Sequence, residues 1–381
     1  MLVERRSDNR RALRIAMVAP PYFTVPPSGY GGVEAVVADL VDALVDRGHH
    51  VTLIGAGRHG TKAQRFFSTY EQPPSHGLGL PLPEAVHAAL VGRIVEGLAV
   101  DLVHDHTLAG PLLARGRTCP TVVTAHGPVD GEPGLYYHAL DDCVELVAIS
   151  EAQRAKAPLL PWVATVTNAI RVESFPFHRE KEEFALFLGR FHPEKAPHLA
   201  IEAARDARLS IVLAGKCAEP VEREYFAREI EPRLGPDVVV FGPADALEKR
   251  DLLARARCLL FPVLWDEPFG LVMTEAMACG TPVVALRRGS VPEVVVDGHT
   301  GIIVDHPDQL AGAVARSASI DPAACRRHVE ENFSIEGMAA GYEVAYRRAL
   351  RRARRMRTFS GHPSGARIVP LPPLALGGSE N

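Results

Sequence analysis

Two glutamates eight residues apart, Glu267 and Glu275, lie within the stretch EPFGLVMTEAMACGTPVVA. Helical spacing begins just after Gly270, so the pair spans the junction between a loop and a helix. The free amides of a helix N-terminus attract anions. The arrangement would suit a ligand with hydroxyl groups at both ends and phosphates in the middle. An isolated pair of this kind is more often a turn residue and a solvated helix residue, so the surrounding sequence has to decide.

A second candidate phosphate site lies near the amino terminus, in the stretch PPSGYGGVEAVV. A strand-like apolar run precedes it, and apolar residues at helical spacing follow from Val33. Glycines such as Gly31 and Gly32 ahead of a helix let a phosphate or a sugar come close to the backbone. The stretch matches neither G-x-G-x-x-G nor G-x-x-x-x-G-K-[ST], so by itself it predicts only a tight, glycine-rich turn.

Composition narrows the class of protein. A chain of 381 residues with 47% hydrophobic content has enough material for two cores. Its 42 Lys and Arg residues are balanced by 46 Asp and Glu residues, which disfavours a nucleic-acid partner and favours a small molecule. Neither a membrane span nor an apolar leader is found, and the six cysteines are scattered without a metal-binding pattern. We expect a soluble cytoplasmic protein with reduced thiols.

Strand and helix patterns alternate along most of the chain, which predicts doubly wound parallel sheets. A polar, proline-containing stretch at 171–184 interrupts the alternation, which then restarts. We therefore expect two Rossmann-like domains and a linker. The predicted boundaries are a flexible tail at 1–13, an acceptor-binding domain at 14–171, a linker at 172–183, a nucleotide-sugar domain at 184–348, and a basic helix end with a disordered tail at 349–381.

Four motifs of the chain resemble those of the retaining nucleotide-sugar glycosyltransferases of family 4, and they occur in the family's order. These enzymes have the GT-B fold of two facing Rossmann-like domains. The most specific is E-x7-E, from Glu267 to Glu275, followed by Gly289 and Glu293 in GSVPEVV. The others are LGRFHPEKAPHLAIEA, the amino-terminal glycines, and TAHG. The resemblance runs from Arg14 to about residue 348.

The resemblance implies a role for each matched residue. Cations and amides would hold the diphosphate and stabilise the charge that develops on the leaving group; these are Arg190, Lys195, Gly31, Gly32, Phe269, Gly270 and Leu271. Glu275 would accept hydrogen bonds from the ribose diol, and Glu267 would bind a sugar hydroxyl. His126 would bind the donor sugar; its alternative role is that of a strand-end histidine capping a turn.

The resulting hypothesis is transfer of a hexose from a nucleoside diphosphate to an acceptor hydroxyl, with retention of anomeric configuration. No D-x-D element stands at a strand end, so we expect neither a metal nor another cofactor. The donor would be a UDP-, GDP- or ADP-hexose, and the acceptor a carbohydrate, a lipid-linked molecule or a small molecule. The alternatives are a nucleotide-sugar epimerase, a phosphorylase that uses pyridoxal phosphate, for which no supporting motif is found, and a catalytically silent sugar-nucleotide binding module.

Three further features carry weaker expectations. His104 and His106 flank an aspartate in VHDHT, and we expect them to be cleft or core residues that do not converge on one ion. The basic stretch RRALRRARRMR favours a solvated helix over contact with an anionic membrane. The family commonly has N-G-[VI]-D at the end of the first domain, where this chain has Asn168, Ala169, Ile170 and Arg171, so the cleft wall near the linker should differ.

Overall fold

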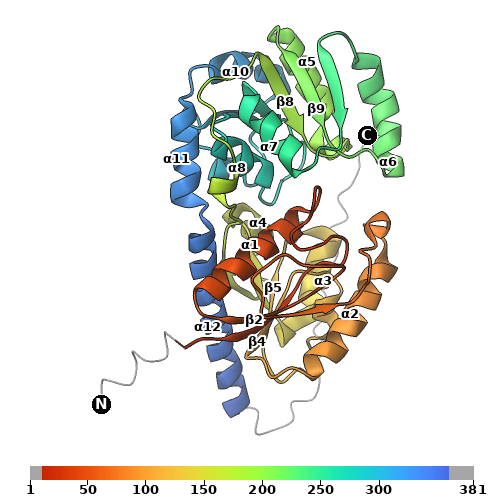
Figure 1. Ribbon diagram of the computed structural model, residues 1–381, viewed down its shortest axis with the longest axis vertical. Helices are drawn as coiled ribbons and strands as arrows, with labels where there is room; N and C mark the ends of the chain where they lie inside the picture. The colour runs from red at the N-terminus through yellow and green to blue at the C-terminus, as the bar shows by residue number, and fades with distance from the viewer. Residues whose placement is uncertain (1–10, 360–381) are drawn as a thin grey trace.

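The computed structural model describes residues 11–359, which form two parallel sheets placed one above the other along the longest axis (Figure 1). This arrangement confirms the predicted class of two facing Rossmann-like units. Most of the two tails predicted at 1–13 and 349–381 lies outside the described residues.

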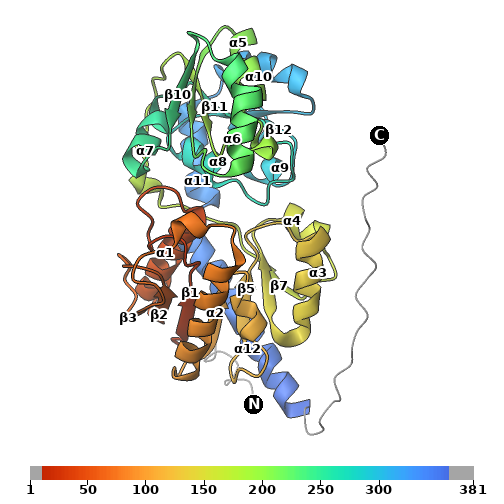
Figure 2. The ribbon, with the colours of Figure 1, turned by 90° about the vertical axis from the view of Figure 1, so that its right-hand side faces the viewer.

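The first sheet has seven parallel strands in the order β3-β2-β1-β4-β5-β6-β7. Its inner strands are buried on both faces because helices cover both sides (Figure 2). The strands are β1 (Arg14–Val18), β2 (His50–Gly55), β3 (Arg65–Ser68), β4 (Leu102–Asp105), β5 (Thr121–Thr124), β6 (Glu145–Ala148) and β7 (Trp162–Thr165). The helices between them are α1 (Gly32–Asp46), α2 (Pro81–Glu96), α3 (Gly131–Leu140) and α4 (Glu151–Lys156).

The second sheet has six parallel strands in the order β10-β9-β8-β11-β12-β13. The strands are β8 (Phe184–Leu188), β9 (Ser210–Ala214), β10 (Val238–Gly242), β11 (Cys258–Phe261), β12 (Val283–Leu286) and β13 (Gly301–Val304). The remaining helices are α5 (Pro197–Asp206), α6 (Pro220–Tyr225), α7 (Ala246–Arg255), α8 (Leu271–Ala278), α9 (Val291–Val294), α10 (Leu310–Ser317), α11 (Pro322–Asn332) and α12 (Ile335–Phe359).

One strand of the first sheet has no clear pattern in the sequence. β3 pairs with β2 alone, at the edge of the sheet. Its four residues are only partly buried or exposed, with no alternation between faces. A short edge strand of this kind carries little pattern, because pairing on one side alone demands no buried face.

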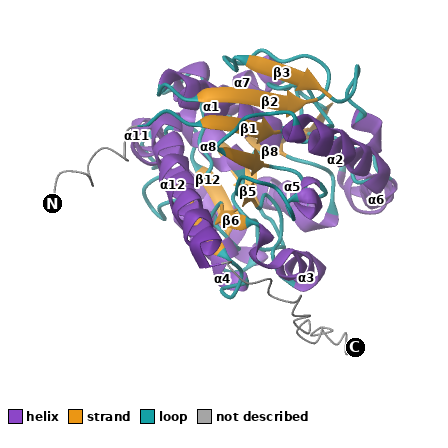
Figure 3. Cartoon of the chain, turned by 90° about the horizontal axis from the view of Figure 1, so that it is seen from below, coloured by secondary structure: helices purple, strands orange, loops and turns teal. Residues whose placement is uncertain are grey.

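The last helix returns to the first sheet. Tyr342, Tyr346 and Ala349 on α12 are fully buried in the same core as β1 and α1. Viewed from below, α12 lies along the outside of the first sheet (Figure 3). The structure therefore differs from the sequence-based boundary at 348, which assigned the start of this helix to the second domain. The apolar spacing predicts a buried helix face, but it does not say which core receives it.

A partly buried lysine helps to fasten the linker to the second sheet. The ammonium of Lys181 donates to the carbonyl oxygens of Ala254 at 2.8 Å and Cys279 at 2.9 Å, and to the hydroxyl of Thr281 at 2.9 Å. These carbonyls stand at the C-terminal ends of α7 and α8, where the helix dipole favours a cation. Burial lowers the pKa of Lys181 to about 8.

No helix within residues 11–359 is long and apolar enough to cross a membrane. Each of the six cysteines, all in this range, is outside any disulfide.

Replacing Lys181 with methionine should lower the free energy of unfolding by about 1 to 3 kcal/mol, because two buried carbonyls lose their donor. Urea denaturation of Lys181→Met against wild type measures the loss. Lys62→Met is the matched control, since Lys62 is half exposed and pairs only with surface carboxylates; it should stay within about 0.5 kcal/mol of wild type. Equal losses in the two variants would contradict the anchoring role.

Candidate functional site

The larger cavity between the two sheets gathers most of the predicted phosphate and ribose ligands. It measures about 1040 Å³ including its open mouth, and both halves of the chain line it. From the first half come Gly31 and Gly32, and from the second come Arg190, Leu271 and Glu275. All five were singled out from the sequence, and the structure places them around one space.

The glycine loop approaches α8 closely across this cavity. Gly31 caps α1 with a φ of 139°, a conformation that favours glycine. A Cβ added to Gly32 would lie 3.3 Å from Cδ1 of Leu271, the first residue of α8. The amide-rich ends of α1 and α8 therefore face the same space, as a diphosphate between them requires.

A buried carboxyl group lies beside the same loop. Glu34, in the first turn of α1, is 4% exposed, and burial raises its pKa to about 7. An added Cβ on Gly31 would lie 3.2 Å from the Oε2 atom of Glu34. Because this carboxyl can be protonated near neutral pH, it opposes an incoming phosphate less than an ordinary glutamate would.

Arg190 is held by carboxylates that the sequence analysis did not single out. It follows β8, and its guanidinium lies 3.6 Å from Oε1 of Glu222 and 3.8 Å from Oε2 of Glu219. Glu222 is fully buried, and its other oxygen accepts from the backbone amides of Ala218 and Glu219. Oε1 of Glu222 has no hydrogen-bond partner among the described residues. Glu222 thus lies near enough to attract Arg190 but too far away for a hydrogen bond. The N–H groups of Arg190 remain available to a ligand in the cavity.

Glu275 forms an ion pair with another residue of the cavity wall. Nζ of Lys249 on α7 donates to Oε1 of Glu275 at 2.6 Å. The second oxygen of Glu275 has no hydrogen bond with the described residues. A single carboxylate can thus keep its lysine and still accept from a ligand hydroxyl.

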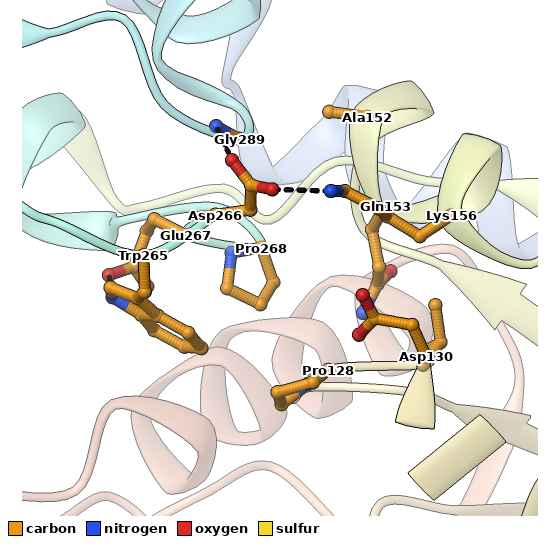
Figure 4. A pocket seen from close by; sticks show the side chains of 11 residues that line it. Pro128, Asp130, Ala152, Gln153, Lys156, Trp265, Asp266, Glu267, Pro268 and Gly289 are labelled. Carbon is orange, nitrogen blue, oxygen red and sulfur yellow. Dashed lines mark hydrogen bonds and ion pairs between the residues drawn. The ribbon is translucent and has the colours of Figure 1, made fainter. Parts of the chain in front are cut away.

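Glu267 borders a second and smaller cavity, which Glu275 does not line (Figure 4). The two glutamates therefore border different cavities. Oε2 of Glu267 accepts from Nζ of Lys195 and, at 3.1 Å, from Nε1 of Trp265. The ammonium of Lys195 also lies 5.0 Å from the centre of the Trp265 ring. Lys195 therefore contacts the sugar-binding candidate Glu267 directly, while it lies outside the lining of the larger cavity.

The backbone at Gly289 fixes the loop that carries Glu267. Gly289 has a φ of 49°, and an added Cβ would overlap the backbone of Glu267. Its amide donates to Oδ1 of Asp266 at 3.0 Å, and the next amide, of Ser290, donates to the carbonyl of Glu267 at 2.9 Å. The hydroxyl of Ser290 bonds the carbonyl of Phe269 at 2.9 Å. Phe269 is buried and packs in the core, while Gly270 caps α8 with a φ of 75°.

Two contacts join α4 to the second sheet beside the smaller cavity. The carboxylate of Glu293 accepts from the amides of Glu151 at 2.8 Å and Ala152 at 2.6 Å. At the other end of α4, Lys156 forms an ion pair with Asp266, which holds the pKa of Asp266 below its ordinary value (Figure 4). The family motif position Glu293 thus serves as a bridge between the two sheets.

His126 follows β5 and is partly buried beside two other histidines. Its Nε2 atom lies 2.8 Å from Nδ1 of His106, and burial lowers the pKa of His126 to about 4. His104 and His106 are both buried, as expected of core residues, and being two apart they lie on the same side of the chain. Their ring centroids are 4.0 Å apart. Within residues 11–359, no three His, Cys, Asp or Glu side chains form a group that could hold a metal ion.

The departure from the family pattern near the linker has a structural counterpart. Ala169 and Ile170 line the larger cavity. Arg171 lies 3.3 Å from Asp39 and 3.5 Å from Asp42, both on α1. An arginine at this position therefore attaches the chain leaving the first sheet to the helix that begins with the glycine loop.

Several residues of the site escaped the sequence analysis: Glu34, Glu222, Lys249 and Trp265. All four contact a predicted ligand residue or border it. Glu34 and Trp265 lie within a few residues of Gly31 and Glu267, so the quoted motifs could have drawn attention to them. Glu222 and Lys249 are ordinary helix residues whose partners are distant in sequence.

Comparison with known families assigns most of the chain. Residues 30–171 match the model described as Glycosyltransferase Family 4, and residues 171–332 match the one described as Glycosyl transferases group 1. Among curated proteins, the D-inositol 3-phosphate glycosyltransferase of Mycobacteroides abscessus is 30% identical over 66% of this chain and 61% of its own length. That of Streptomyces bingchenggensis is 34% identical over 46% of this chain and 43% of its own length. The chain thus spans less than two thirds of these relatives.

Solved structures show the same two-domain architecture. AviGT4, a glycosyltransferase involved in avilamycin A biosynthesis, has 26% identity and a TM-score of 0.70, covering 89% of this chain and 98% of its own. HepE of Anabaena in complex with UDP-glucose has 17% identity and a TM-score of 0.68, covering 87% and 98% of the two chains. The second likeness shows the fold alone.

The lowered pKa of His126 makes stability depend on pH. Between pH 6.5 and 4 the unfolded chain binds a proton at this position that the folded chain does not, so the free energy of unfolding decreases as the pH falls. At pH 5 the loss from this residue is about 2 kcal/mol. Urea denaturation at pH 7 and pH 5 should show a smaller loss for His126→Gln, whereas His50→Gln, at an exposed histidine, should behave as wild type. An unchanged loss in His126→Gln would contradict the assignment.

Proposed function

Since the chain belongs to the glycosyltransferase group 1 and family 4 enzymes of GT-B fold, we propose that it transfers a hexose from a nucleoside diphosphate to an acceptor hydroxyl, with retention at the anomeric carbon. The observation that supports this most strongly is the shared cavity of the glycine loop, Arg190, the start of α8 and Glu275. Cationic, amide and carboxylate groups line this one cavity together, which supports binding of a diphosphate and a ribose there.

In this proposal the diphosphate lies between the glycine loop and α8. The amides of Gly31, Gly32 and residues 269–271 donate to its oxygens, and the guanidinium of Arg190 offers charged donors from the β8 side. The carboxylate of Glu275 accepts from the ribose hydroxyls through the oxygen that Lys249 leaves free.

The sugar then lies toward the smaller cavity. Glu267 accepts from a sugar hydroxyl, and His126 contacts the sugar from the first domain. Lys195, which bonds Glu267 in the structure, has three donors and can contact the sugar-proximal phosphate as well. Fixed cations near the departing phosphate stabilise the charge that grows as the glycosidic bond breaks.

No residue is matched as a nucleophile, so we propose displacement on a single face of the sugar. The acceptor oxygen bonds to the anomeric carbon as the bond from that carbon to the phosphate oxygen breaks. The acceptor's proton passes to the departing phosphate. The protein's part is to orient both substrates, to exclude water and to stabilise the leaving group. The proposal needs neither a metal ion nor another cofactor.

The acceptor is proposed only as a class: a carbohydrate, a lipid-linked molecule or a small molecule bearing a hydroxyl. The curated relatives named above act, by their names, on D-inositol 3-phosphate, which makes a polyol acceptor a reasonable first choice for screening.

Binding of UDP, GDP and ADP to wild type and Glu275→Ala tests the donor site. One nucleotide at a hundredfold excess over its Kd should raise the free energy of unfolding by about 2.7 kcal/mol. Thermal unfolding should show this gain in wild type and in Glu336→Ala, an exposed control on α12, and little of it in Glu275→Ala. If no nucleotide stabilises the folded protein, the donor-site assignment is contradicted.

The stereochemical part of the proposal has its own test. With an α-linked donor, the product formed by the purified enzyme should carry an α-linkage, read from the anomeric proton coupling in the NMR spectrum. A β-linked product would overturn displacement on one face, and a free altered sugar made without acceptor would indicate an epimerase.

A further inference from the structure

Three imidazole rings form one contact chain at the carboxyl ends of β4 and β5. The centroids of His104 and His106 are 4.0 Å apart, and those of His106 and His126 are 5.1 Å apart. One hydrogen bond joins Nδ1 of His106 to Nε2 of His126 at 2.8 Å. Which nitrogen donates determines which form of His126 is presented to a ligand.

A methionine on β1 decides this question. Nε2 of the buried His106 lies 3.2 Å from Sδ of Met17. A thioether sulfur can only accept a hydrogen bond, so the nitrogen that faces it carries the proton. Burial lowers the pKa of His106, so its ring is neutral and has one proton. Its Nδ1 therefore accepts, and Nε2 of His126 donates.

The same assignment of protons leaves one ring nitrogen of His126 unprotonated. Its ring is also neutral, because burial lowers the pKa to about 4. With the proton on Nε2, its Nδ1 carries a lone pair. Nδ1 has no hydrogen-bond partner within residues 11–359 and is not among the enclosed unpaired atoms. His126 thus presents a hydrogen-bond acceptor to its surroundings.

The stack beneath His126 is held by α12. Hydrogen bonds fix both nitrogens of His104, to the hydroxyl of Tyr346 at 2.7 Å and to that of Thr124 at 2.8 Å. Tyr342 bonds Thr124 in turn at 2.9 Å. Since both ring nitrogens of His104 are bonded, its ring is fixed, and it packs against the ring of His106 at a centroid distance of 4.0 Å, which holds His106 in place. His106 is therefore a positioning residue for His126.

Glu267 offers the same kind of group. Its Oε2 is occupied by Lys195 and Trp265, while Oε1 has no hydrogen-bond partner among the described residues. The cavity that Glu267 borders also carries Asp130, and its one lining cation, Lys156, is paired with Asp266. Acceptors thus predominate where the sugar is proposed to bind.

We propose that Met17 and His106 are positioning residues that fix the tautomer of His126, so that its Nδ1 accepts a hydrogen bond from a hydroxyl of the bound sugar. The inference rests on the proposed function and narrows its substrate class. Neutral hexosyl donors fit, because each hydroxyl can donate. A uronosyl donor whose carboxylate lies against Nδ1 of His126 brings lone pairs against a lone pair and is disfavoured.

The tautomer can be measured directly in the full-length protein. With ¹⁵N-labelled histidine, long-range proton–nitrogen correlation spectra should show His126 with a protonated Nε2 and a bare Nδ1, the assignment coming from His126→Gln. His106→Asn, whose amide oxygen can take the place of Nδ1, should preserve this form, and His106→Phe should not. A protonated Nδ1 in wild type would overturn the inference, whatever the enzyme does.

Donor selectivity is the second readout. For the base identified by nucleotide binding, kcat/KM for the hexosyl donor should exceed that for the matching uronosyl donor by about 100-fold or more. His106→Phe should reduce this ratio about 10-fold, while His106→Asn and the exposed control His50→Gln keep it. A purely structural role for His106 would lower both donors equally, and an unchanged ratio in His106→Phe therefore contradicts the inference. If no donor is transferred at all, the proposed function fails, and the tautomer spectrum still decides this inference.

Discussion

The site depends on the close contact between Gly289 and the backbone of Glu267. No side chain fits there, and two successive amides from the start of α9 bond the loop 266–269. That loop aims Glu267 at Lys195, places Asp266 opposite Lys156, and sets the turn at Gly270 from which α8 begins. Because α8 carries Leu271 and Glu275, one backbone contact determines the geometry of both cavities.

The groups proposed to bind ligand are held by partners from other parts of the chain. Arg190 is oriented by a buried glutamate on α6, Glu275 by a lysine on α7, and α4 of the first sheet by Glu293 of the second. The contacts of Arg190 and Glu275 are ion pairs, and each leaves at least one donor or acceptor unused. Such a network combines a fixed arrangement with the capacity to bind a polar ligand, and this is the basis of electrostatic preorganisation.

The sequence was informative where a function imposes a local pattern. Apolar runs predicted the strands, glycines predicted the turn before α1, and the E-x7-E spacing predicted a loop followed by α8. The E-x7-E spacing could not tell that Glu267 and Glu275 border separate cavities, since that depends on how the loop and the start of α8 pack against the rest of the folded chain. Nor could it find Lys249 or Glu222, whose spacing is that of any solvated helix residue and whose importance comes from a partner brought near by folding. The edge strand β3 escaped because a short strand paired on one side carries little pattern, and the destination of α12 escaped because apolar spacing does not say which core receives a helix.

The return of α12 to the first sheet also bears on how the protein is made. Tyr342 bonds Thr124 across 218 residues of chain, and its ring fills the core of the sheet that the ribosome completes first. During synthesis the amino-terminal half emerges with that part of its core open, and it cannot be closed until nearly the whole second half has followed. Contacts of such long sequence separation fold slowly and leave apolar surface exposed meanwhile. The two halves are therefore a single unit of folding, although each has its own sheet.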